Sequence, residues 1–354
     1  MDILLLGAGN VGKAIAYDLS VDYDVMAADV DKENLKKIGR YTDTMKIDAS
    51  DQDELKETVE GYDLAICALP GRFGYKAVVS AIEAGTDIVD VSFMPENPLD
   101  LNSKAKENGV SVIVDAGFGP GMSNVFMGKI SDEMDSIDYA IIRIGGLPIE
   151  PQPPLFYKVT WSPKDLIEEY TREARMKRDG EIVNLDPLED INKIKIRGNE
   201  FEEFYSDGLR TLLHTIEVRT LEETTLRWKG HLGKIKMLRE LGFFEEEHVD
   251  ETLGVITPHM KFESKDFSIM DIHAEGTIDG KKEEINYYFY DEADELFSSM
   301  SRCTGFTTAT MARLLVEKEI DNGVIPPEML GLKEEYYDFV VDRIRNKGIT
   351  IERT

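Results

Sequence analysis

Three glycines near the N-terminus, Gly7, Gly9 and Gly12, form the pattern G-x-G-x-x-G with Asn10 and Val11 inside it. They follow the apolar run Ile3–Gly7 and open a stretch of helical periodicity. In this setting the first glycine permits a tight turn, the second lets the backbone approach a pyrophosphate, and the third lets the helix pack close to the sheet. The motif therefore predicts a dinucleotide site at a helix N-terminus, the alternative being glycines that only turn the chain.

Asp29 indicates which dinucleotide would bind. It closes the second predicted strand, 22 residues after Gly7. An acid at this place can accept hydrogen bonds from both ribose hydroxyls and repels a 2′-phosphate. The sequence therefore predicts NAD as the cofactor in preference to NADP.

Other predicted strand ends should also meet the cofactor, because ligands of open α/β sheets lie outside the carboxyl ends of the strands. The expected contacts are Asp48 and Ala49 at the adenine, Ala68, Leu69 and Pro70 at the pyrophosphate, and Asp90 and Ser92 at the nicotinamide ribose. Each of these residues could instead be a helix cap or a turn residue.

Two carboxylates are candidates for proton handling. Glu96 follows the fifth predicted strand in a loop with Pro95 and Pro98, and Asp115 ends the sixth strand. Either side chain could bind a substrate ammonium or relay its proton. The structural alternative for either carboxylate is a helix cap or a hinge hydrogen bond.

Lys158 is the third catalytic candidate. We expect a strand over Phe156–Trp161, whose period of two places Tyr157 and Trp161 on one face and Lys158 on the other. If Lys158 faces a cleft it could accept a proton, and otherwise it is a surface lysine.

Basic side chains complete the list. A substrate carboxylate prefers the fork of an arginine, for which Arg210 is the first candidate and Arg302 the second. Arg227 and Arg239 are expected to form structural ion pairs. His231, near a predicted helix start, could hydrogen-bond the substrate or be purely structural.

Metal and disulfide chemistry find no support in the sequence. The two cysteines, Cys67 and Cys303, are far apart with no CxxC, and the five histidines have neither HxxH nor HxxxH spacing. We therefore expect no metal site and no disulfide framework.

The elements that position these residues are of two kinds. Before residue 125, short apolar runs alternate with helical segments, which predicts a parallel, doubly wound α/β sheet of the Rossmann type. The expected strands are Ile3–Gly7, Asp24–Asp29, Asp43–Asp48, Leu64–Ala68, Asp87–Val91 and Val110–Asp115.

The Gly- and Pro-rich stretch Ala116–Gly121 is expected to be a hinge. Residues 126–300 have hairpin patterns with turns at Asp179-Gly180 and Asp279-Gly280, which predicts a second α+β domain for substrate and dimer contacts, with a mostly antiparallel sheet. Residues 301–354 are expected to return to the first domain.

Composition restricts the partners. The net charge of −28 disfavours nucleic acid and anionic membranes, whereas it would attract a small cation, although the acid could also serve solubility alone. No apolar run approaches the length of a membrane span, and the N-terminus lacks the basic region of a signal peptide. We therefore expect a cytoplasmic protein.

Motifs spread in order over nearly the whole chain resemble the saccharopine dehydrogenase-like superfamily. They are Gly7–Gly12, Asp90–Ser92 with Glu96, Asp115–Asn124, Gly145–Pro148, Trp161–Pro163 with Glu169 and Tyr170, Ser206–Arg210, Thr225–His231 continued by Lys234–Lys236, and Gly305–Thr307. The short chain and the segments Gly145–Pro148 and Trp161–Pro163 are most similar to the L-lysine 6-dehydrogenases of that superfamily.

The resemblance implies NAD-linked oxidative deamination of the ε-amine of L-lysine to 2-aminoadipate 6-semialdehyde, with release of ammonia, by a homodimer. The nearest alternative is a saccharopine-type or carboxynorspermidine-type dehydrogenase acting on a secondary amine. NADP-using saccharopine reductases typically carry an arginine near the position of Asp29, which is absent here, and have a longer substrate domain. A non-catalytic NAD-binding protein is a third possibility.

Overall fold

The computed structural model describes residues 1–160 and 162–354 of the 354-residue chain. The chain forms two compact units, and each unit is built from two segments. The first unit comprises Met1–Asp132 and Ser301–Gly348, and the second comprises Glu133–Met300 and Ile349–Thr354. The chain therefore passes from one unit to the other three times.

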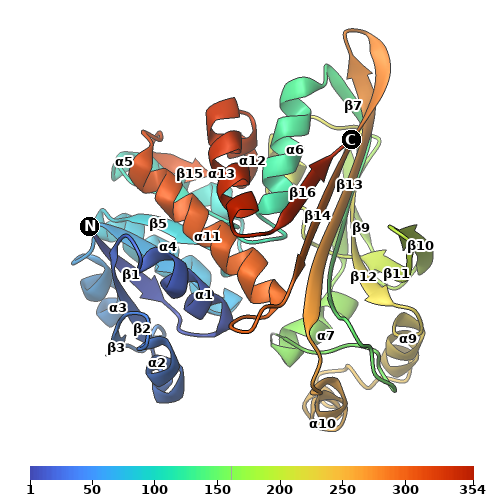
Figure 1. Ribbon diagram of the computed structural model, residues 1–354, viewed down its shortest axis with the longest axis horizontal. Coiled ribbons are helices and arrows are strands. Elements are labelled where there is room, and N and C mark those ends of the chain that lie inside the picture. The colour runs from blue at the N-terminus through green and yellow to red at the C-terminus, as the bar shows by residue number, and fades with distance from the viewer. Residues whose placement is uncertain (161) are drawn as a thin grey trace. The chain divides into compact units, whose positions relative to one another are not determined.

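The first unit contains a seven-stranded, fully parallel sheet in the order β15-β6-β5-β4-β1-β2-β3 (Figure 1). Its strands are β1 (Asp2–Leu6), β2 (Asp24–Asp29), β3 (Asp43–Lys46), β4 (Leu64–Cys67), β5 (Asp87–Asp90), β6 (Ser111–Ile113) and β15 (Gly323–Ile325). The predicted doubly wound fold is confirmed, and each of the six expected strands is present within about two residues of its expected ends.

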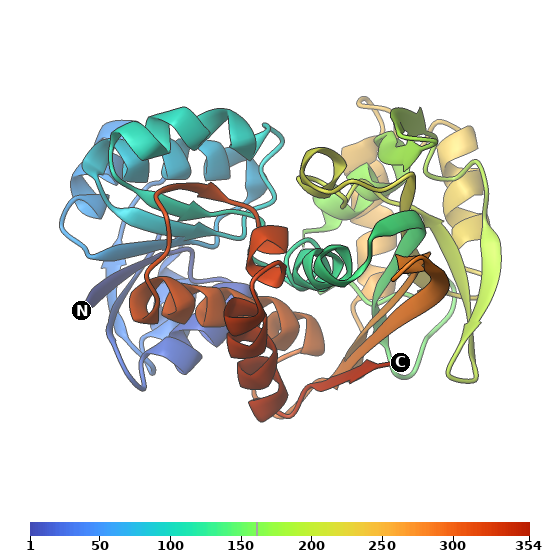
Figure 2. The same ribbon diagram turned by 90° about the horizontal axis from the view of Figure 1, so that it is seen from above.

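Helices lie on both faces of this sheet (Figure 2). The helices of the first unit are α1 (Asn10–Leu19), α2 (Lys32–Ile38), α3 (Gln52–Val59), α4 (Gly71–Ala84), α5 (Asn102–Glu107), α6 (Met122–Glu133), α11 (Ser299–Glu317), α12 (Pro327–Gly331) and α13 (Glu334–Asn346), of which α6 and α11 each extend across a unit boundary. Asp31 and Asp51 each accept two backbone N–H bonds at the start of α2 and α3. These N-caps explain why α2 and α3 each begin at the residue that follows the capping aspartate.

The segment Ala116–Gly121 is not the expected hinge. The Gly117 N–H donates to the Pro120 carbonyl at 3.1 Å, and the Met122 N–H donates to the Gly117 carbonyl at 2.9 Å. A Cβ on Gly121 would lie 2.0 Å from the Gly117 oxygen. The segment is therefore a tightly closed loop inside the first unit, and the chain first leaves that unit after Asp132.

The second unit is organised around a nine-stranded mixed sheet, whose main path runs β10-β11-β12-β7-β13-β14-β16, with β8 attached at β12 and β9 attached at β8. Its strands are β7 (Ser136–Pro148), β8 (Ala174–Arg178), β9 (Glu181–Leu185), β10 (Asn192–Ile196), β11 (Asn199–Tyr205), β12 (Thr220–Trp228), β13 (Asp266–Ile278), β14 (Lys281–Glu292) and β16 (Thr350–Arg353). The pair β12–β7 is parallel and the other described pairs of this sheet are antiparallel, as expected.

Helices α7 (Pro163–Thr171), α8 (Leu212–Thr215), α9 (Leu232–Glu240) and α10 (Val249–Ile256) complete the second unit. Both predicted two-residue turns are present, at Asp179-Gly180 between β8 and β9 and at Asp279-Gly280 between β13 and β14. All four turn residues have positive φ, as a type I′ turn requires.

The expected strand Phe156–Trp161 is wrong over the part that the structure describes, because residues 156–160 are irregular and Trp161 lies outside the described residues. Three nearby prolines remove backbone donors, and Phe156 has φ +57°, which no strand allows. The period-of-two argument for Tyr157 and Lys158 therefore does not apply.

The last six residues also differ from expectation. Instead of returning to the first unit with residues 301–348, they form β16, which pairs antiparallel with β14 from Tyr287 to Tyr290. A short C-terminal strand can pair with any open edge of a sheet. The local sequence of β16 therefore does not indicate that β14 is its partner.

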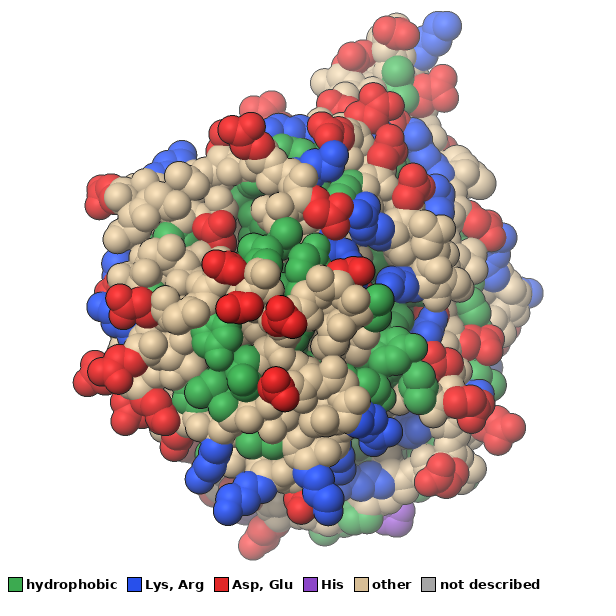
Figure 3. Space-filling model, turned by 60° about the vertical axis from the view of Figure 1, so that its left-hand side comes forward, with side chains coloured by type: hydrophobic (Ala, Val, Ile, Leu, Met, Phe, Trp, Pro, Cys, Tyr) green, Lys and Arg blue, Asp and Glu red, His purple; other side chains and the backbone are tan. Residues whose placement is uncertain are grey.

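Two observations describe the surface. Asp and Glu side chains are spread over the face seen in Figure 3, with Lys and Arg between them, in keeping with the net charge of −28. Among the described residues, no helix is long and apolar enough to cross a membrane.

The packing of α11 on α1 depends on Gly305. A Cβ at this position would lie 2.7 Å from Ala14 Cβ and 3.1 Å from the Val11 oxygen. We expect Gly305→Ala to lower the free energy of unfolding by about 1–3 kcal/mol, because the helices would have to move apart. The control Gly254→Ala, in α10 with no atom within 4 Å of its Cβ, should raise it by about 0.5–1 kcal/mol. Urea unfolding would measure the free energy of unfolding of both variants. Equal changes would contradict the dependence of the α11–α1 packing on Gly305.

Candidate functional site

The glycine turn after β1 has the shape that a dinucleotide needs. Gly7 has φ +102°, and a Cβ there would lie 2.4 Å from the Ala68 carbonyl oxygen. A Cβ on Gly12 would lie 2.0 Å from the Gly7 oxygen, whereas at Gly9 no atom lies within 4 Å. Gly7 and Gly12 are thus required by packing, while Gly9 faces open space that a pyrophosphate can enter.

The N-terminus of α1 supplies donors for that group. No side chain caps the helix, whose N-cap residue is Gly9, so its first N–H groups are not taken by a capping oxygen. Asn10 and Val11 form the first turn, where Asn10 Oδ1 accepts a bond from the Lys13 ammonium at 3.0 Å. These residues fit a bound dinucleotide phosphate.

Asp29 lies at the end of the neighbouring strand β2. Its Oδ2 accepts the Ala8 N–H at 2.7 Å, and its Oδ1 accepts the Asp31 N–H at 2.7 Å. These bonds tie the carboxylate to the glycine turn. The next residue, Val30, is 55 % exposed and carries no positive charge. A carboxylate therefore lies against the glycine turn, and the residue after it is neutral and exposed.

The ends of β3 and β4 add two polar turns. Asp48 is exposed and accepts bonds from the Ser50 N–H and hydroxyl, which lower the pKa of its carboxyl. Ala49 is half-buried beside it. After β4, Ala68 and Leu69 are half-buried, and Pro70 precedes α4, a second helix without a side-chain cap.

A buried polar group lies at the end of β5. Asp90 is fully buried, and this burial raises the pKa of its carboxyl to about 6 although the Cys67 thiol and the Ser92 hydroxyl approach it. The charge of Asp115 raises the pKa of Asp90 further. Burial raises the pKa of the Cys67 thiol well above its usual value, so this thiol stays protonated.

The two carboxylate candidates of the first unit have different environments. Asp115 is 2 % exposed with φ +50°, and the next N–H, that of Ala116, donates to the Asp90 carbonyl at 2.9 Å. Glu96 is exposed in the loop after β5. The structure therefore brings Asp115 close to Asp90 at the carboxyl edge of the sheet, whereas Glu96 is open to solvent.

The remaining candidates, apart from Arg302, belong to the second unit. Lys158 is half-buried, and its ammonium donates to the Ser264 carbonyl. Arg302, the second arginine candidate, belongs to the first unit, where it donates to the Lys347 carbonyl at 3.0 Å. The predicted structural ion pairs are confirmed, with Arg227 2.7 Å from Glu169 and Arg239 2.8 Å from Asp186.

His231 is fully buried and has protein partners at both ring nitrogens. Its Nδ1 lies 2.7 Å from the Leu155 carbonyl oxygen and its Nε2 lies 2.9 Å from the Tyr170 hydroxyl. Since a carbonyl only accepts, Nδ1 carries the proton and Nε2 accepts from Tyr170, whose oxygen accepts from Arg227 Nε at 2.9 Å. Burial, with Arg227 nearby, lowers the pKa of His231 to about 3, so the ring is neutral.

This chain of bonds holds the irregular segment that contains Leu155 and Tyr157. The Arg227 guanidinium also lies 4.6 Å from the Tyr157 ring centroid. The arrangement gives His231 a positioning function toward that segment. Sequence reasoning missed Tyr170 as its partner because the two residues lie on different elements, 61 residues apart.

Arg210 is 6 % exposed and has φ +51°, in the loop between β11 and α8. Beside this loop lies Glu223 of β12, which sequence reasoning also missed. Glu223 is 4 % exposed, and burial raises the pKa of its carboxyl to about 8. No local sequence pattern marks it, because its neighbours come from other elements.

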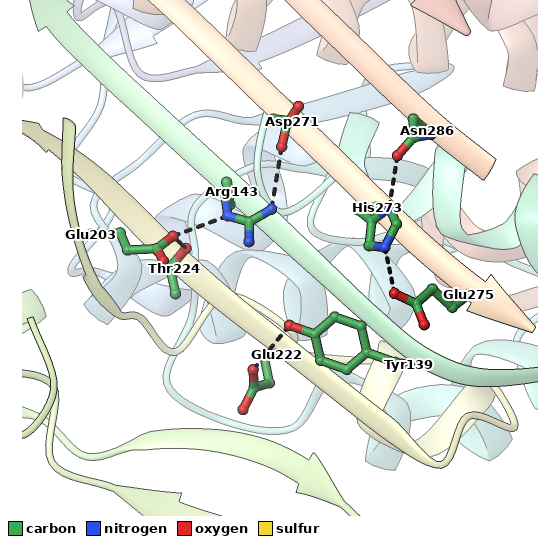
Figure 4. A network of polar contacts seen from close by, with 9 residues as sticks. All are labelled: Tyr139, Arg143, Glu203, Glu222, Thr224, Asp271, His273, Glu275 and Asn286. Atoms are coloured by element: carbon green, nitrogen blue, oxygen red, sulfur yellow. Dashed lines mark hydrogen bonds and ion pairs between the residues drawn. The ribbon is translucent and has the colours of Figure 1, made fainter. Parts of the chain in front are cut away.

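A second polar network covers part of one face of the same sheet (Figure 4). Arg143 of β7 lies 3.1 Å from Glu203 and 3.3 Å from Asp271, and His273 is held between Asn286 and Glu275. Each of these charged groups is paired within the network, as buried and half-buried charges need to be.

Comparison with known families shows where the chain belongs. The model of the saccharopine dehydrogenase NADP binding domain matches residues 3–113, and that of the saccharopine dehydrogenase C-terminal domain matches residues 117–349. The chain belongs to the saccharopine dehydrogenase family. The resemblance read from its motifs is thereby confirmed at the level of the family.

Individual relatives are distant. The NADP-dependent, L-glutamate-forming saccharopine dehydrogenase of Saccharomyces cerevisiae is 23 % identical over 70 % of this chain and 59 % of its own length. Carboxyaminopropylagmatine dehydrogenase of Synechocystis is 23 % identical over 88 % of this chain and 87 % of its own. The chain thus spans about three fifths of the yeast relative.

A solved structure shares the whole fold of this family member. Apo saccharopine dehydrogenase from Saccharomyces cerevisiae aligns with a TM-score of 0.85 at 19 % identity, over 100 % of this chain and 99 % of the other. At this identity the likeness concerns the fold alone.

The bonds around His231 generate a stability prediction. We expect Tyr170→Phe to lower the free energy of unfolding by about 1–3 kcal/mol, because His231 Nε2 and Arg227 Nε would lose a buried partner. The control Tyr139→Phe removes a half-buried hydroxyl 3.3 Å from Glu222 and should cost less than about 1 kcal/mol. Urea unfolding at pH 7 would measure the free energy of unfolding of both variants. Equal decreases would show that the Tyr170 hydroxyl contributes no more to stability than the half-buried Tyr139 hydroxyl.

Proposed function

We propose that the protein is an NAD-dependent dehydrogenase that oxidatively deaminates the ε-amine of L-lysine to 2-aminoadipate 6-semialdehyde and releases ammonia. Family membership supports an amine oxidoreductase, and the resemblance of the motifs supports lysine as the substrate.

The cofactor assignment depends on Asp29 and Val30. The family model is described as NADP binding and the yeast relative is named for NADP. In this chain the carboxylate of Asp29 is tied to the glycine turn, where we propose that the ribose binds, and the exposed Val30 offers no cation to a 2′-phosphate. We therefore assign NAD, with its pyrophosphate at the N-terminus of α1 and its adenosine ribose at Asp29.

The observation that carries lysine over saccharopine is the state of the arginines in the second unit. Nine of them pair with carboxylates of the protein itself: Arg143, Arg172, Arg175, Arg178, Arg197, Arg219, Arg227, Arg239 and Arg353. Saccharopine has three carboxylates and needs several convergent cations, whereas lysine has one. We propose that Arg210, which is buried in the loop between β11 and α8, binds the one carboxylate of lysine.

Proton handling is the second task of the protein. A nicotinamide cofactor, when bound, would supply the acceptor for a hydride from the amine-bearing carbon, and this chemistry requires the neutral amine. The free ε-amine has a pKa of about 10.4, so the site must hold the ammonium and remove its proton. We propose that the carboxylate of Asp115 receives the proton and that the neighbouring Asp90, whose pKa burial raises to about 6, exchanges it close to neutral pH. We keep Glu96 and Lys158 as alternative proton acceptors.

A carboxyaminopropylagmatine-type or saccharopine-type dehydrogenase remains the second candidate, favoured by the relatives' names. Such enzymes would act on a secondary amine. The acidic surface seen in Figure 3 would attract lysine and carboxyaminopropylagmatine, which are both cations. It disfavours saccharopine, which has three carboxylates.

An NADH absorbance assay tests the proposed function. With NAD, we expect reduction driven by L-lysine, with kcat/KM rising from neutral to strongly alkaline pH as the amine and its base lose their protons. The panel should include saccharopine and carboxyaminopropylagmatine. Reduction with either of these and none with lysine would overturn the assignment.

The cofactor choice generates its own test. The double variant Asp29→Ser with Val30→Arg should weaken NAD and improve NADP, because it removes the repelling carboxylate and supplies a partner for the phosphate. The expected change in the NAD to NADP ratio of kcat/KM is on the order of tenfold to a hundredfold. An unchanged ratio would remove Asp29 from the cofactor site.

A further inference from the structure

The loop that carries Arg210 is held in an unfavourable conformation. It connects β11 to α8, and Arg210 itself has φ +51°, a region that costs an arginine energy. The side chain is 6 % exposed. Neighbouring groups must therefore stabilise the loop for Arg210 to keep this position.

One support comes from the strand β8. The Arg175 N–H donates to Asp207 Oδ1 at 3.1 Å, and its guanidinium meets both carboxyl oxygens at 2.8 and 3.0 Å. Arg172 lies 3.6 Å from the same carboxylate. Asp207 thus fixes the outer side of the loop.

The other support is Glu223, on the buried side. Its backbone carbonyl accepts the Ser206 N–H at 3.2 Å, and its Oε1 accepts the Ser206 hydroxyl at 3.1 Å. The Gly208 N–H also donates to this carboxyl. A Cβ on Gly208 would lie 2.0 Å from Oε1, so the carboxyl fills the space that a side chain at Gly208 would need.

We propose that Glu223 is a positioning residue for substrate binding: by holding Ser206 and Gly208, it fixes the loop that presents Arg210 to the carboxylate of the amino-acid substrate. This inference rests on the proposed function for the identity of the ligand. The contacts of Glu223 with the loop do not depend on it.

The charge state of Glu223 makes this support sensitive to pH. The acidic groups that face it are Asp207 on the loop and Glu169 on α7, and both raise the pKa of Glu223, which burial brings to about 8. The cations nearby pair with those acids, Arg172 and Arg175 with Asp207 and Arg227 with Glu169. Glu223 is thus uncharged at neutral pH, and above about pH 8 its ionisation places a charge in a buried site beneath the loop, where desolvation opposes the charged form.

Three variants test the proposal. Glu223→Ala removes the support, and Glu223→Gln keeps the shape without a titrating proton. The control is Glu222→Gln, a neighbour on β12 whose carboxyl contacts Tyr139 and Arg178 instead of the loop. Arg210→Ala serves as the reference for loss of the carboxylate contact.

The first measurement needs no substrate. Hydrogen exchange of the full-length protein should show the amides of residues 208–211 exchanging about tenfold faster or more in Glu223→Ala, with wild-type rates in Glu222→Gln. Unchanged exchange in Glu223→Ala would overturn the proposal whatever the substrate is. If that variant does not fold, Glu223→Gln above pH 8 should protect the loop better than wild type, and equal protection would overturn it.

The second measurement ties the loop to the carboxylate. Glu223→Ala should raise KM for L-lysine by about tenfold to a hundredfold, as Arg210→Ala does, and leave kcat/KM for cadaverine, which lacks the carboxylate, within about twofold. The KM for lysine of the wild type should rise above pH 8 relative to that of Glu223→Gln. An equal loss on both amines would overturn the carboxylate role. If Glu223→Ala speeds hydrogen exchange in the loop but the enzyme turns over no primary amine, the proposed function is refuted. The support of the loop by Glu223 would then still stand.

Discussion

All strands of the first sheet run in one direction, and the cofactor side of the molecule depends on this parallel alignment. It brings the turn at Gly7, the carboxylate of Asp29 and the buried Asp90 to one edge, although they come from different parts of the chain. Strands buried on both faces must be apolar along their length, so polar side chains are tolerated only where a strand ends. The same constraint that builds the core therefore concentrates the chemistry at the edge.

The second unit meets the opposite problem, because several of its polar groups are buried within the fold. Each needs a partner inside the protein, and Arg227, Tyr170 and His231 provide one another with donors and acceptors in a fixed direction. Glu223 is accommodated differently, by remaining protonated beneath a glycine-containing loop. Both arrangements position irregular backbone, at Leu155 and at Arg210, that could not hold its shape through strand pairing alone.

Much of the first unit could be predicted because its information is local. Apolar runs, the glycine pattern and the Asp caps of α2 and α3 each act within a few residues, and the six strands follow from them. The family could be recognised from motifs in order along the chain. The strand expected at Phe156–Trp161 failed because proline and a positive φ outweigh an alternating pattern. Cys67 beside Asp90, Tyr170 beside His231 and Glu223 beneath Gly208 depend on register between distant segments, which no single stretch encodes.

The three passages of the chain between units determine the order in which the fold can be completed during synthesis. The strand β15 pairs with β6 at Ser111 and Gly323, so it leaves the ribosome only after the whole stretch from Glu133 to Met300 has been made. At about 5–20 residues per second, the first sheet waits many seconds with β6 as an open edge. That edge exposes unpaired backbone donors and acceptors to other chains for the whole interval. The nascent first unit is therefore most vulnerable to mispairing while the second unit is being translated, and the arrival of the C-terminal segment ends that exposure.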